Sequence, residues 1–298
     1  MQQILTLVAG PPARGIDNSM LAAACAALAR EGASVGAPLW LAERAALDLP
    51  FEAAAPARAQ AAASAALAAW PIDLLAQPCE GRRKRLLLAD MDSTIITLET
   101  LDELADFAGV KDKVAALTER SMRGELDFET TLLERVAMLR GLSASALERT
   151  WQRVALTKGA STLVRTMRKA GAFTALISGG FSYFSHRVRE LVGFDHDEAN
   201  RLEVADGRLT GRVLPPVMDA AGKRATLERL AREHALPLAA TLAVGDGAND
   251  LAMIAAAGLG VAYRGKPPLA AAARARVDHG DLTALLYFQG YRAEEFVI

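Results

Sequence analysis

The sequence predicts an α/β protein with a Rossmann-like parallel sheet, a helical insertion and a small α+β module at the N-terminus. Three observations lead to this prediction. From Leu86 onward, short apolar runs alternate with helical patterns, as in a parallel sheet covered on both faces. The stretch between the first of these runs and Gly159 has only helical periodicity. The first 80 residues have a different, alanine-rich composition.

Length and charge exclude several classes of protein. The 298 residues include 34 Lys and Arg and 35 Asp and Glu, a net charge of −1, which gives no electrostatic support for binding nucleic acid or an anionic membrane surface. No apolar run approaches the ~18 residues of a membrane-spanning helix, and the basic start of a signal peptide is missing. The two cysteines have no metal-site spacing. We expect a cytoplasmic protein without nucleic-acid or membrane partners, and leave a homodimer open.

The N-terminal module, residues 1–80, is expected to follow the order β-α-β-α-β. Its predicted elements are strands at Ile4–Val8, Ser34–Leu41 and Pro71–Pro78 and helices at Asn18–Arg30 and Ala53–Ala69. We find no cluster of candidate catalytic residues in it. The basic run from Arg82 to Arg85 is interpreted as a solvated linker, because no aromatic residues interleave it.

The larger domain is predicted over residues 84–298. Its strand candidates are Leu86–Asp90, Phe173–Ser178, Thr241–Asp246 and Leu259–Tyr263. Helices of the insertion are expected at Asp102–Ala108, Val114–Arg123, Phe128–Leu139 and Ala144–Val154. Asp206-Gly207, between two short alternating runs, predicts a hairpin over Leu202–Leu214.

The strongest chemical signal is a pair of acids, Asp90 and Asp92, directly after the first apolar run of the larger domain. Carboxylates two residues apart at the end of a strand leave it on the same side. In parallel α/β sheets, ligands bind at this end of the strands. Two surface acids capping a helix would be the simpler interpretation, but it leaves the preceding strand unexplained. The pair therefore predicts a reaction centre.

Three further groups of residues follow the later strands in the same manner. Ser178 and Gly179 offer a hydroxyl and a backbone amide at a helix start, a cradle for an anion. Lys223 begins a predicted helix, and Asp246 and Asp250 flank a glycine-containing loop whose carboxylates suit Mg²⁺. Considered separately, the serine–glycine string also fits an ordinary loop, and the lysine also fits a solvated side chain.

Together these residues favour phosphoryl transfer, which requires positioning and neutralisation of charge. Asp90 would attack phosphorus and form an aspartyl-phosphate, which divides one difficult step into two. Asp92 would protonate the leaving alkoxide and later accept a proton from water. Mg²⁺ and Lys223 would neutralise the phosphate, which the nucleophile would otherwise repel.

At this point the sequence resembles the haloacid dehalogenase (HAD) superfamily with a helical C1-type cap, and within it the branch that hydrolyses O-phospho-L-serine. The resemblance covers about residues 84–294. It rests on four strings in order: DMDSTIITLETLDELADFAG, TERSMRGELDFETTLLERVAML, ISGGFSYF and VGDGANDLAMIAAAGLGVAY. The N-terminal module resembles, more loosely, the ACT-like regulatory segment of longer bacterial members. The insertion would then be a cap over about residues 97–157.

The resemblance implies a role for each matching residue. Asp90 matches the nucleophile and Asp92 the general acid/base. The Mg²⁺ ligands of the family match the Asp90 carboxylate, the Asp92 carbonyl and Asp246, with Asp250 in support. Phosphate-binding groups match Ser178, the Gly179 amide and Lys223, and Asn249 matches a substrate contact near the phosphate.

The resemblance also assigns the serine end of the substrate. Glu99 and Arg135 match the residues that hold its amino and carboxylate groups, and Met122 and Phe128 match apolar cap residues that shield the site. The first pair agrees with elementary chemistry, because a zwitterionic head requires one anion and one cation. From the residues alone, Glu99 and Arg135 also fit surface charge pairs, and Met122 and Phe128 fit the interior of the cap.

We therefore expect Mg²⁺-dependent hydrolysis of O-phospho-L-serine to L-serine and phosphate, the last step of L-serine biosynthesis. One alternative is a related phosphatase or phosphotransferase acting on another small phosphomonoester. Another, from a different functional class, is a non-catalytic amino-acid sensor that acts through the N-terminal module. Substrate preference discriminates the first alternative, and serine binding to the isolated module discriminates the second.

Overall fold

The structure, a computed structural model, describes residues 2–11 and 15–298 and divides into two compact units. The first unit contains the chain up to Arg85 together with residues 158–171 and 275–298. The second contains residues 86–157 and 172–274. Across the described ranges, no helix has the length and apolarity required to cross a bilayer. The domain division at residues 80–84 stays a prediction.

The first unit is built on an antiparallel sheet with strand order β2-β4-β1-β5, and β3 also pairs with β4. Its N-terminal elements are β1 (Gln3–Ala9), α1 (Asn18–Arg30), β2 (Ser34–Val35), β3 (Leu39–Ala42), β4 (Ala46–Glu52), α2 (Pro56–Leu67) and β5 (Ile72–Pro78). The later segments add α7 (Ala160–Lys169), β12 (Ala275–Val277), α12 (Ala284–Phe288) and the short helix η4 (Ala293–Glu295).

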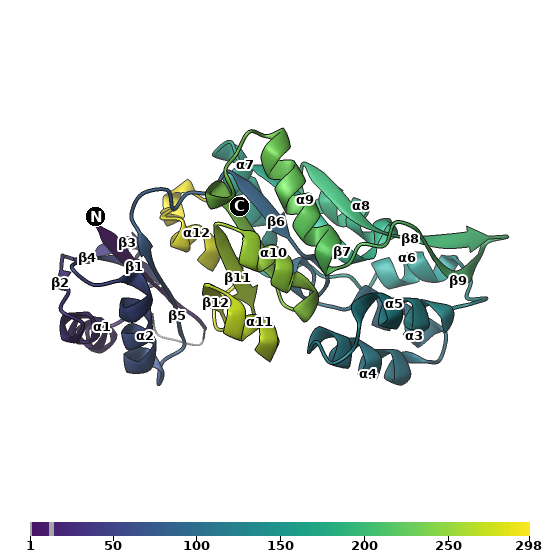
Figure 1. Ribbon diagram of the computed structural model, residues 1–298, viewed down its shortest axis with the longest axis horizontal. Coiled ribbons are helices and arrows are strands. Elements are labelled where there is room, and N and C mark those ends of the chain that lie inside the picture. Colours follow the sequence, from purple (N-terminus) through teal and green to yellow (C-terminus); the bar gives the residue numbers. More distant parts are fainter. Residues whose placement is uncertain (1, 12–14) are drawn as a thin grey trace. The chain divides into compact units, whose positions relative to one another are not determined.

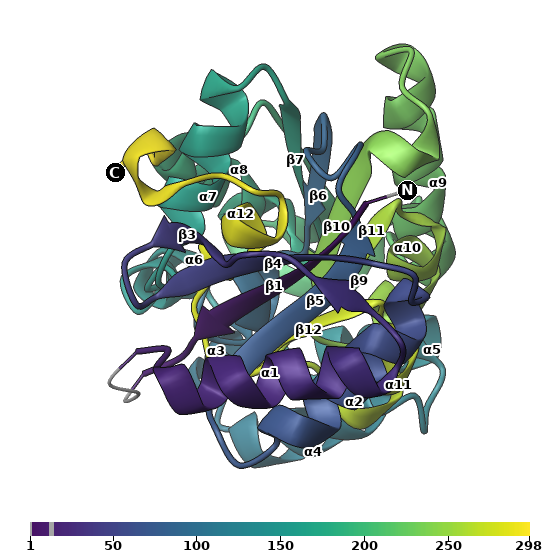
Figure 2. The same ribbon diagram turned by 90° about the vertical axis from the view of Figure 1, so that its left-hand side faces the viewer.

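Helices α1 and α2 lie side by side across one face of this sheet (Figure 2). Asp17 begins α1, where its carboxylate accepts the N–H groups of Ser19 and Met20 at 2.8 and 3.0 Å. Buried residues recur every three or four positions, at Met20, Ala24, Ala27 and Leu28 in α1 and at Ala59, Ala63 and Leu67 in α2. This spacing gives each helix one apolar face toward the sheet.

The predicted order of the N-terminal module is wrong in one respect. The single strand expected at Ser34–Leu41 is divided into β2 and β3, and a further strand, β4, follows at Ala46–Glu52. The sequence pattern of β4 is weak because it contains Asp48 and Pro50, two residues that are rare in strands. Asp48 is nevertheless buried, because Thr6 donates a hydrogen bond to it at 2.6 Å.

The prediction of a solvated linker at Arg82–Arg85 is wrong for Arg82 and Lys84. Arg82 forms a 2.7 Å ion pair with the buried Asp48, and its side chain is only 16% exposed. Arg83 pairs with Glu295 at 2.8 Å and stacks over Tyr291. Lys84 is 8% exposed, whereas Arg83 and Arg85 are exposed, so Arg82 and Lys84 pack into the first unit and the other two face solvent.

One buried carboxylate joins strand β5 to the C-terminal segment of the first unit through three hydrogen bonds. Asp73, on β5, is 4% exposed and accepts the backbone N–H groups of Asp278, His279 and Gly280 at 2.8, 3.1 and 2.6 Å. Residues more than 200 positions apart in sequence are joined in this way.

We predict that Asp73→Ala lowers the free energy of unfolding by about 2–4 kcal/mol, because three backbone amides lose their acceptor. Denaturant titration measures this change. Asp73→Asn retains one carbonyl oxygen as an acceptor, so it should lower the free energy of unfolding by less than Asp73→Ala does. An Asp73→Ala protein as stable as the wild type would contradict this role of the carboxylate.

The second unit contains the parallel sheet, with order β11-β10-β6-β7-β8-β9. Its strands are β6 (Leu86–Ala89), β7 (Phe173–Phe181), β8 (His196–Ala205), β9 (Arg208–Leu214), β10 (Thr241–Gly245) and β11 (Leu259–Tyr263). All neighbours are parallel except β8 and β9, which form the predicted hairpin around Asp206-Gly207. Both turn residues have positive φ, at 49° and 70°, as this turn requires.

Helices of the second unit cover the sheet and form the insertion. The covering helices are α8 (Ser182–Val192), α9 (Ala220–Glu233), α10 (Leu251–Ala256) and α11 (Pro267–Ala272), with short helices η2 (Leu238–Ala240) and η3 (Ala248–Asp250). After the turn η1 (Met91–Ile95), the insertion contains α3 (Thr100–Phe107), α4 (Lys111–Met122), α5 (Phe128–Ala137) and α6 (Ser145–Trp151). Figure 1 shows these four helices together beyond the carboxyl ends of the strands. The predicted fold class is confirmed.

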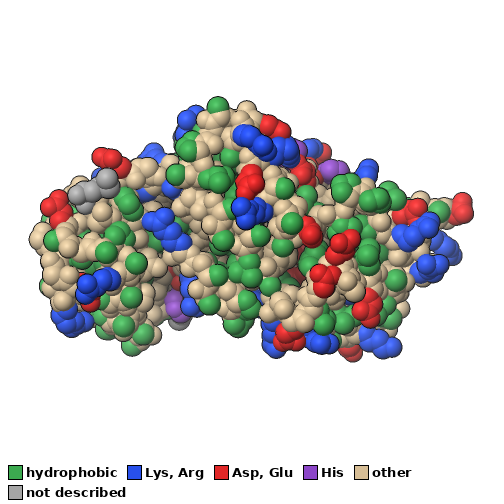
Figure 3. Space-filling view, in the orientation of Figure 1, with side chains coloured by type: hydrophobic (Ala, Val, Ile, Leu, Met, Phe, Trp, Pro, Cys, Tyr) green, Lys and Arg blue, Asp and Glu red, His purple; other side chains and the backbone are tan. Residues whose placement is uncertain are grey.

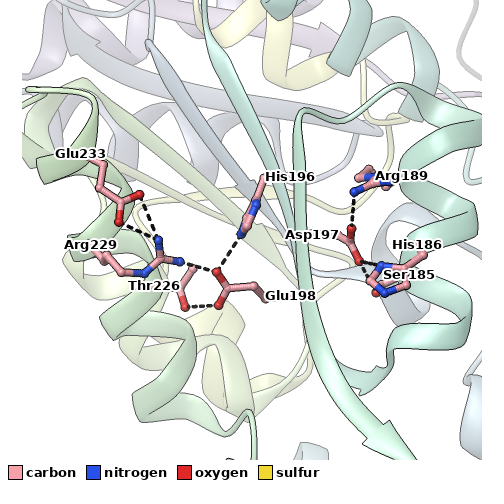
Figure 4. Close-up of polar contacts among 9 residues, drawn as sticks. All are labelled: Ser185, His186, Arg189, His196, Asp197, Glu198, Thr226, Arg229 and Glu233. Atoms are coloured by element: carbon pink, nitrogen blue, oxygen red, sulfur yellow. Dashed lines mark hydrogen bonds and ion pairs between the residues drawn. The ribbon is translucent and has the colours of Figure 1, made fainter.

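Apolar residues from α9, α10 and α11 pack against β6, β7, β10 and β11 in one buried cluster. Strand β8 contacts helices on both faces of the sheet (Figure 4). Asp197 accepts from Ser185 on α8 at 2.6 Å, and the next residue, Glu198, accepts from Thr226 on α9 at 3.1 Å. Successive side chains of a strand point to opposite faces, so the sheet lies between α8 and α9.

The contacts around Asp197 include Ser, His and Asp side chains but do not form a catalytic triad. Ser185 and His186 both contact Asp197, at 2.6 Å each, and within the described chain no hydrogen bond joins the two. A triad requires the imidazole to contact the hydroxyl.

On the face of the molecule in Figure 3, acidic and basic side chains are interspersed.

Candidate active site

The site begins where two adjacent parallel strands end. Strands β6 and β10 pair in register, with Ala89 opposite Val244, and Asp90 donates its backbone N–H to Val244 O at 2.9 Å. Asp90 and Asp246, the residues that follow these two strands, are therefore held at the same edge of the sheet. This is the edge at which ligands bind in open parallel sheets.

Three carboxylates meet there. Asp90, Asp246 and Asp250 are 4%, 3% and 0% exposed, and one oxygen from each lies within 4.8 Å of the others. Asp246 also accepts a hydrogen bond from Thr94 Oγ1 at 3.2 Å. Buried acids this close together can all be ionised only if a cation lies nearby.

Lys223 provides part of the compensating charge. It is fully buried in the first turns of α9, and its Nζ lies 2.7 Å from Oδ1 of both Asp90 and Asp250. The N-cap Asp219 accepts Gly222 N–H at 2.7 Å and so fixes the start of the helix. Burial alone lowers the pKa of Lys223, but the carboxylates of Asp250 and Asp90 raise it by more, so this ammonium stays charged.

Asp250 is already engaged by the protein. One of its oxygens pairs with Lys223, and the other accepts the backbone N–H groups of Asp246 and Gly247 at 3.1 and 3.2 Å. A Cβ on Gly245 would lie 2.3 Å from this carboxylate, so the loop requires glycine there. Asp250 thus orients the loop, and Asp90 and Asp246 remain to face a bound cation.

The pKa shifts agree with a site made for a further cation. Burial, and then the charge of Asp250, raise the pKa of Asp90 to about 7, although Lys223 opposes this change. Burial and Glu99 hold the pKa of Asp246 well above its usual value. The three carboxylates exceed the single ammonium in charge, and hard oxygen ligands of this type fit a divalent cation.

Asp92 has a different environment from the three clustered carboxylates. Its Oδ2 accepts both the backbone N–H and the hydroxyl of Thr100, at 2.9 and 2.7 Å, at the start of α3. Its Oδ1 is buried, lines the cavity and has no hydrogen-bond partner among residues 2–11 and 15–298. Burial, and then the charge of Glu99, hold the pKa of Asp92 well above its usual value, which favours the protonated form that a general acid requires.

The anion cradle predicted at Ser178 and Gly179 lies at the end of β7, which pairs with β6. Gly180 donates its N–H to Ser178 Oγ at 2.9 Å. This bond uses the oxygen as an acceptor, so the hydroxyl proton is available to an anion in the cavity.

The cap contributes the remaining walls of the same cavity. Its lining includes Glu99, Met122, Phe128 and Arg135 from the insertion, facing Asp90, Asp92, Ser178, Gly179 and Asn249. A Cβ on Gly179 would lie 2.6 Å from the Phe128 ring, so the cap packs directly on the cradle. Lys223, Asp246 and Asp250 are not among the lining residues of this cavity. They adjoin the lining residue Asp90, through the ion pair of Lys223 and through the cluster of three carboxylates.

The two charged residues of the cap are fixed by neighbours. Ser93, which has an unusual φ of 55°, donates to Glu99 Oε1 at 2.5 Å. Arg135 is 6% exposed and donates to Thr131 O at 3.1 Å and to Thr118 Oγ1 at 2.8 Å. Burial lowers the pKa of Arg135 and raises that of Glu99, and each charge opposes the shift of the other.

Sequence reasoning missed two residues that support these groups. Thr118 accepts from Arg135 and lies 2.6 Å from Asp102, so it links the guanidinium to α3. Asn200, 1% exposed on β8, donates to Gly179 O at 2.9 Å and Met218 O at 3.3 Å and accepts Met218 N–H at 2.7 Å. A lone Asn or Thr gives no sequence signal of such a role.

Comparison with known proteins agrees with this geometry. Residues 87–255 match the profile of the haloacid dehalogenase-like hydrolases. The chain belongs to this family. It is 44% identical to a phosphoserine phosphatase of Streptomyces coelicolor over 80% of this chain and 58% of that protein. It is 45% identical to one of Archaeoglobus fulgidus over 72% of this chain and 63% of that protein. The chain thus spans about three fifths of the length of these relatives.

A solved structure, named as a phospho-aspartyl intermediate analogue of phosphoserine phosphatase, superimposes with a TM-score of 0.67 and 38% identity. It covers 69% of this chain and 99% of the other. Within the haloacid dehalogenase-like hydrolases, the resemblance is therefore to phosphoserine phosphatases.

We predict that Asn200→Asp weakens binding of inorganic phosphate about tenfold or more, because the Gly179 carbonyl loses its donor and the cradle loosens. Calorimetric titration with phosphate measures this. The substitution retains the acceptor for Met218 N–H, so the loop before α9 keeps one anchor. Unchanged phosphate affinity in a folded Asn200→Asp protein would show that Asn200 does not position the cradle.

Proposed function

We propose that this protein hydrolyses O-phospho-L-serine to L-serine and phosphate, the last step of L-serine biosynthesis. One observation carries the choice of substrate: an acid and a base, Glu99 and Arg135, line the same cavity as Asp90 and Asp92. A phosphomonoester without an amino-acid head would offer no opposite charge to either of these two buried groups.

In this proposal Asp90 attacks the phosphorus atom and the serine oxygen leaves, so that an aspartyl-phosphate forms. Lys223 lies 2.7 Å from Asp90 and reduces the repulsion between the carboxylate and the phosphate. Water then attacks the phosphorus atom, the bond to Asp90 breaks and phosphate is released. The name of the similar solved structure refers to the same type of intermediate in that protein.

Asp92 is proposed as the general acid and base. Its raised pKa keeps a proton on the carboxyl group, which protonates the serine oxygen as the bond to phosphorus breaks. The resulting carboxylate then takes a proton from the attacking water. The two bonds from Thr100 hold one oxygen, so the unpartnered Oδ1 is the atom that exchanges the proton.

We propose Mg²⁺ as the cofactor, held by the carboxylates of Asp90 and Asp246 and the backbone carbonyl of Asp92. The excess of buried carboxylates over Lys223 supports a divalent cation there. When bound, Mg²⁺ neutralises phosphate oxygens and orients them for in-line attack. Asp250 would support the site by holding Lys223 and the loop after β10.

The rest of the substrate has proposed partners on both sides of the cavity. Ser178, the Gly179 amide and Lys223 would bind phosphate oxygens, and the buried, unpartnered Oδ1 of Asn249 would contact the substrate near the phosphate. Glu99 would hold the amino group and Arg135 the carboxylate.

Closure of the cap would exclude water from the reaction. Met122 and Phe128 would supply its apolar cover, and helices α3 to α6, all between residues 97 and 157, support the proposed extent of the cap.

We predict that Arg135→Ala raises KM for phosphoserine about a hundredfold, because the substrate carboxylate loses a charged donor pair. KM for p-nitrophenyl phosphate, which has no such group, should change less than about twofold. Steady-state kinetics with both substrates measures the two values.

The matched control is Arg120→Ala, which removes an arginine whose side chain is 54% exposed on α4. It should leave both KM values unchanged. If Arg135→Ala raised KM equally for both substrates, the assignment of phosphoserine as the substrate would be overturned.

We predict that Mg²⁺ stabilises the protein strongly at about pH 8 and only weakly at about pH 5. The raised pKa values of Asp90, Asp92 and Asp246 mean that the folded state binds more protons than the unfolded state. Without metal, their contribution to stability is therefore present at low pH and lost as the pH rises through these folded pKa values. Metal binding requires the deprotonated carboxylates. The stabilisation that bound Mg²⁺ provides should therefore increase as the pH rises.

Thermal unfolding with MgCl2 or EDTA at the two pH values measures this difference. Asp246→Asn should abolish the increase in Tm at about pH 8. An increase of equal size at both pH values, or one that persists in the variant, would contradict the proposed site.

A further inference from the structure

One buried hydroxyl of the cap has no established role. Ser121, in the last turn of α4, is 6% exposed, and its Oγ has no hydrogen-bond partner in residues 2–11 and 15–298. It lines the same cavity as Glu99 and Arg135.

Two other hydroxyls in the cap helices have a partner in the preceding turn. Thr118 bonds to Val114 O at 3.0 Å, and Thr131 bonds to Asp127 O, in each case the carbonyl four residues earlier. This is the usual partner of a helical Ser or Thr hydroxyl. Ser121 does not use it, and a buried hydroxyl without a partner destabilises the folded protein. A ligand atom that enters the cavity can remove this penalty.

The position of Ser121 indicates which part of a ligand it meets. Thr118 lies three residues earlier on α4, so the two side chains share one face of the helix. Thr118 accepts a hydrogen bond from Arg135 Nη1 at 2.8 Å. Ser121 is therefore on the helix face next to the guanidinium, whereas Glu99 is held by Ser93, outside α4.

We propose that Ser121 Oγ donates a hydrogen bond to the substrate carboxylate that Arg135 binds, and so helps to select amino-acid phosphates. This inference rests on the proposed function. An ionised carboxylate accepts about four hydrogen bonds, and one guanidinium supplies two of them at most through a bidentate contact. A neutral hydroxyl adds a donor without altering the charge balance between Glu99 and Arg135.

The test compares Ser121→Ala with the wild type on phosphoserine and on phosphoethanolamine, which keeps the amine and the phosphate ester but lacks the carboxylate. We expect KM for phosphoserine to rise about tenfold while kcat changes less than about twofold. KM for phosphoethanolamine should not change.

Thr150→Val is the matched control. Thr150, on α6, is also buried with an unpartnered hydroxyl, but it is not among the residues that line the cavity. Its replacement should leave KM unchanged for both substrates. Ser121→Ala should also have a Tm at least as high as the wild type, because alanine favours helix and the unsatisfied hydroxyl is gone.

The possible results separate the role of Ser121 from the proposed function. An unchanged KM for phosphoserine in Ser121→Ala, or an equal rise for both substrates, would overturn the role of Ser121 and leave the proposed function intact. A wild-type protein that does not prefer phosphoserine over phosphoethanolamine would instead overturn the proposed function, and the role of Ser121 with it.

Discussion

The contact on which the site depends is the buried bridge from Lys223 to Asp90 and Asp250, at 2.7 Å to each. Three carboxylates at one sheet edge, all less than 5% exposed, could not remain charged without it. Removal of one partner from such a group leaves an uncompensated buried charge, which costs about 3–5 kcal/mol. One ammonium does not balance three carboxylates, and this remaining negative charge supports the proposal that the site binds a divalent cation together with a phosphate.

The site also depends on how the cap is joined to the core. Thr100 begins α3 and binds Asp92, and Glu99 is the residue just before it. A movement of the first cap helix would therefore shift both the proposed acid and the proposed amine-binding group. Phe128, from α5, packs on Gly179 of the cradle. Substrate recognition and the reacting atoms are thus coupled through two direct contacts within the second unit.

Much of this site could be predicted because strand ends are local features of a sequence. Asp90, Ser178 and Asp246 each follow a short apolar run, and parallel pairing brings such positions together. The hairpin at Asp206-Gly207 was equally local, since its turn chemistry lies in two residues.

The features that the sequence did not predict depend on tertiary contacts between distant residues. Strand β4 and the packing of Arg82 were missed together, because the Asp48–Arg82 ion pair that makes both possible joins residues 34 positions apart. Asn200 and Thr118 were missed for the same reason: each acts through bonds to distant residues. A polar residue in a strand or helix has no pattern that distinguishes such a role from exposure to solvent.

The most direct test of the central claim is to locate the covalent phosphate. The protein is mixed with phosphoserine, quenched in acid within milliseconds and reduced with borohydride, which converts an aspartyl-phosphate to homoserine. Peptide mass spectrometry then identifies the modified position. The account predicts homoserine at position 90 in the wild type, no homoserine in Asp90→Asn, and no turnover by that variant. Modification at another residue, or undiminished turnover by Asp90→Asn, would contradict it.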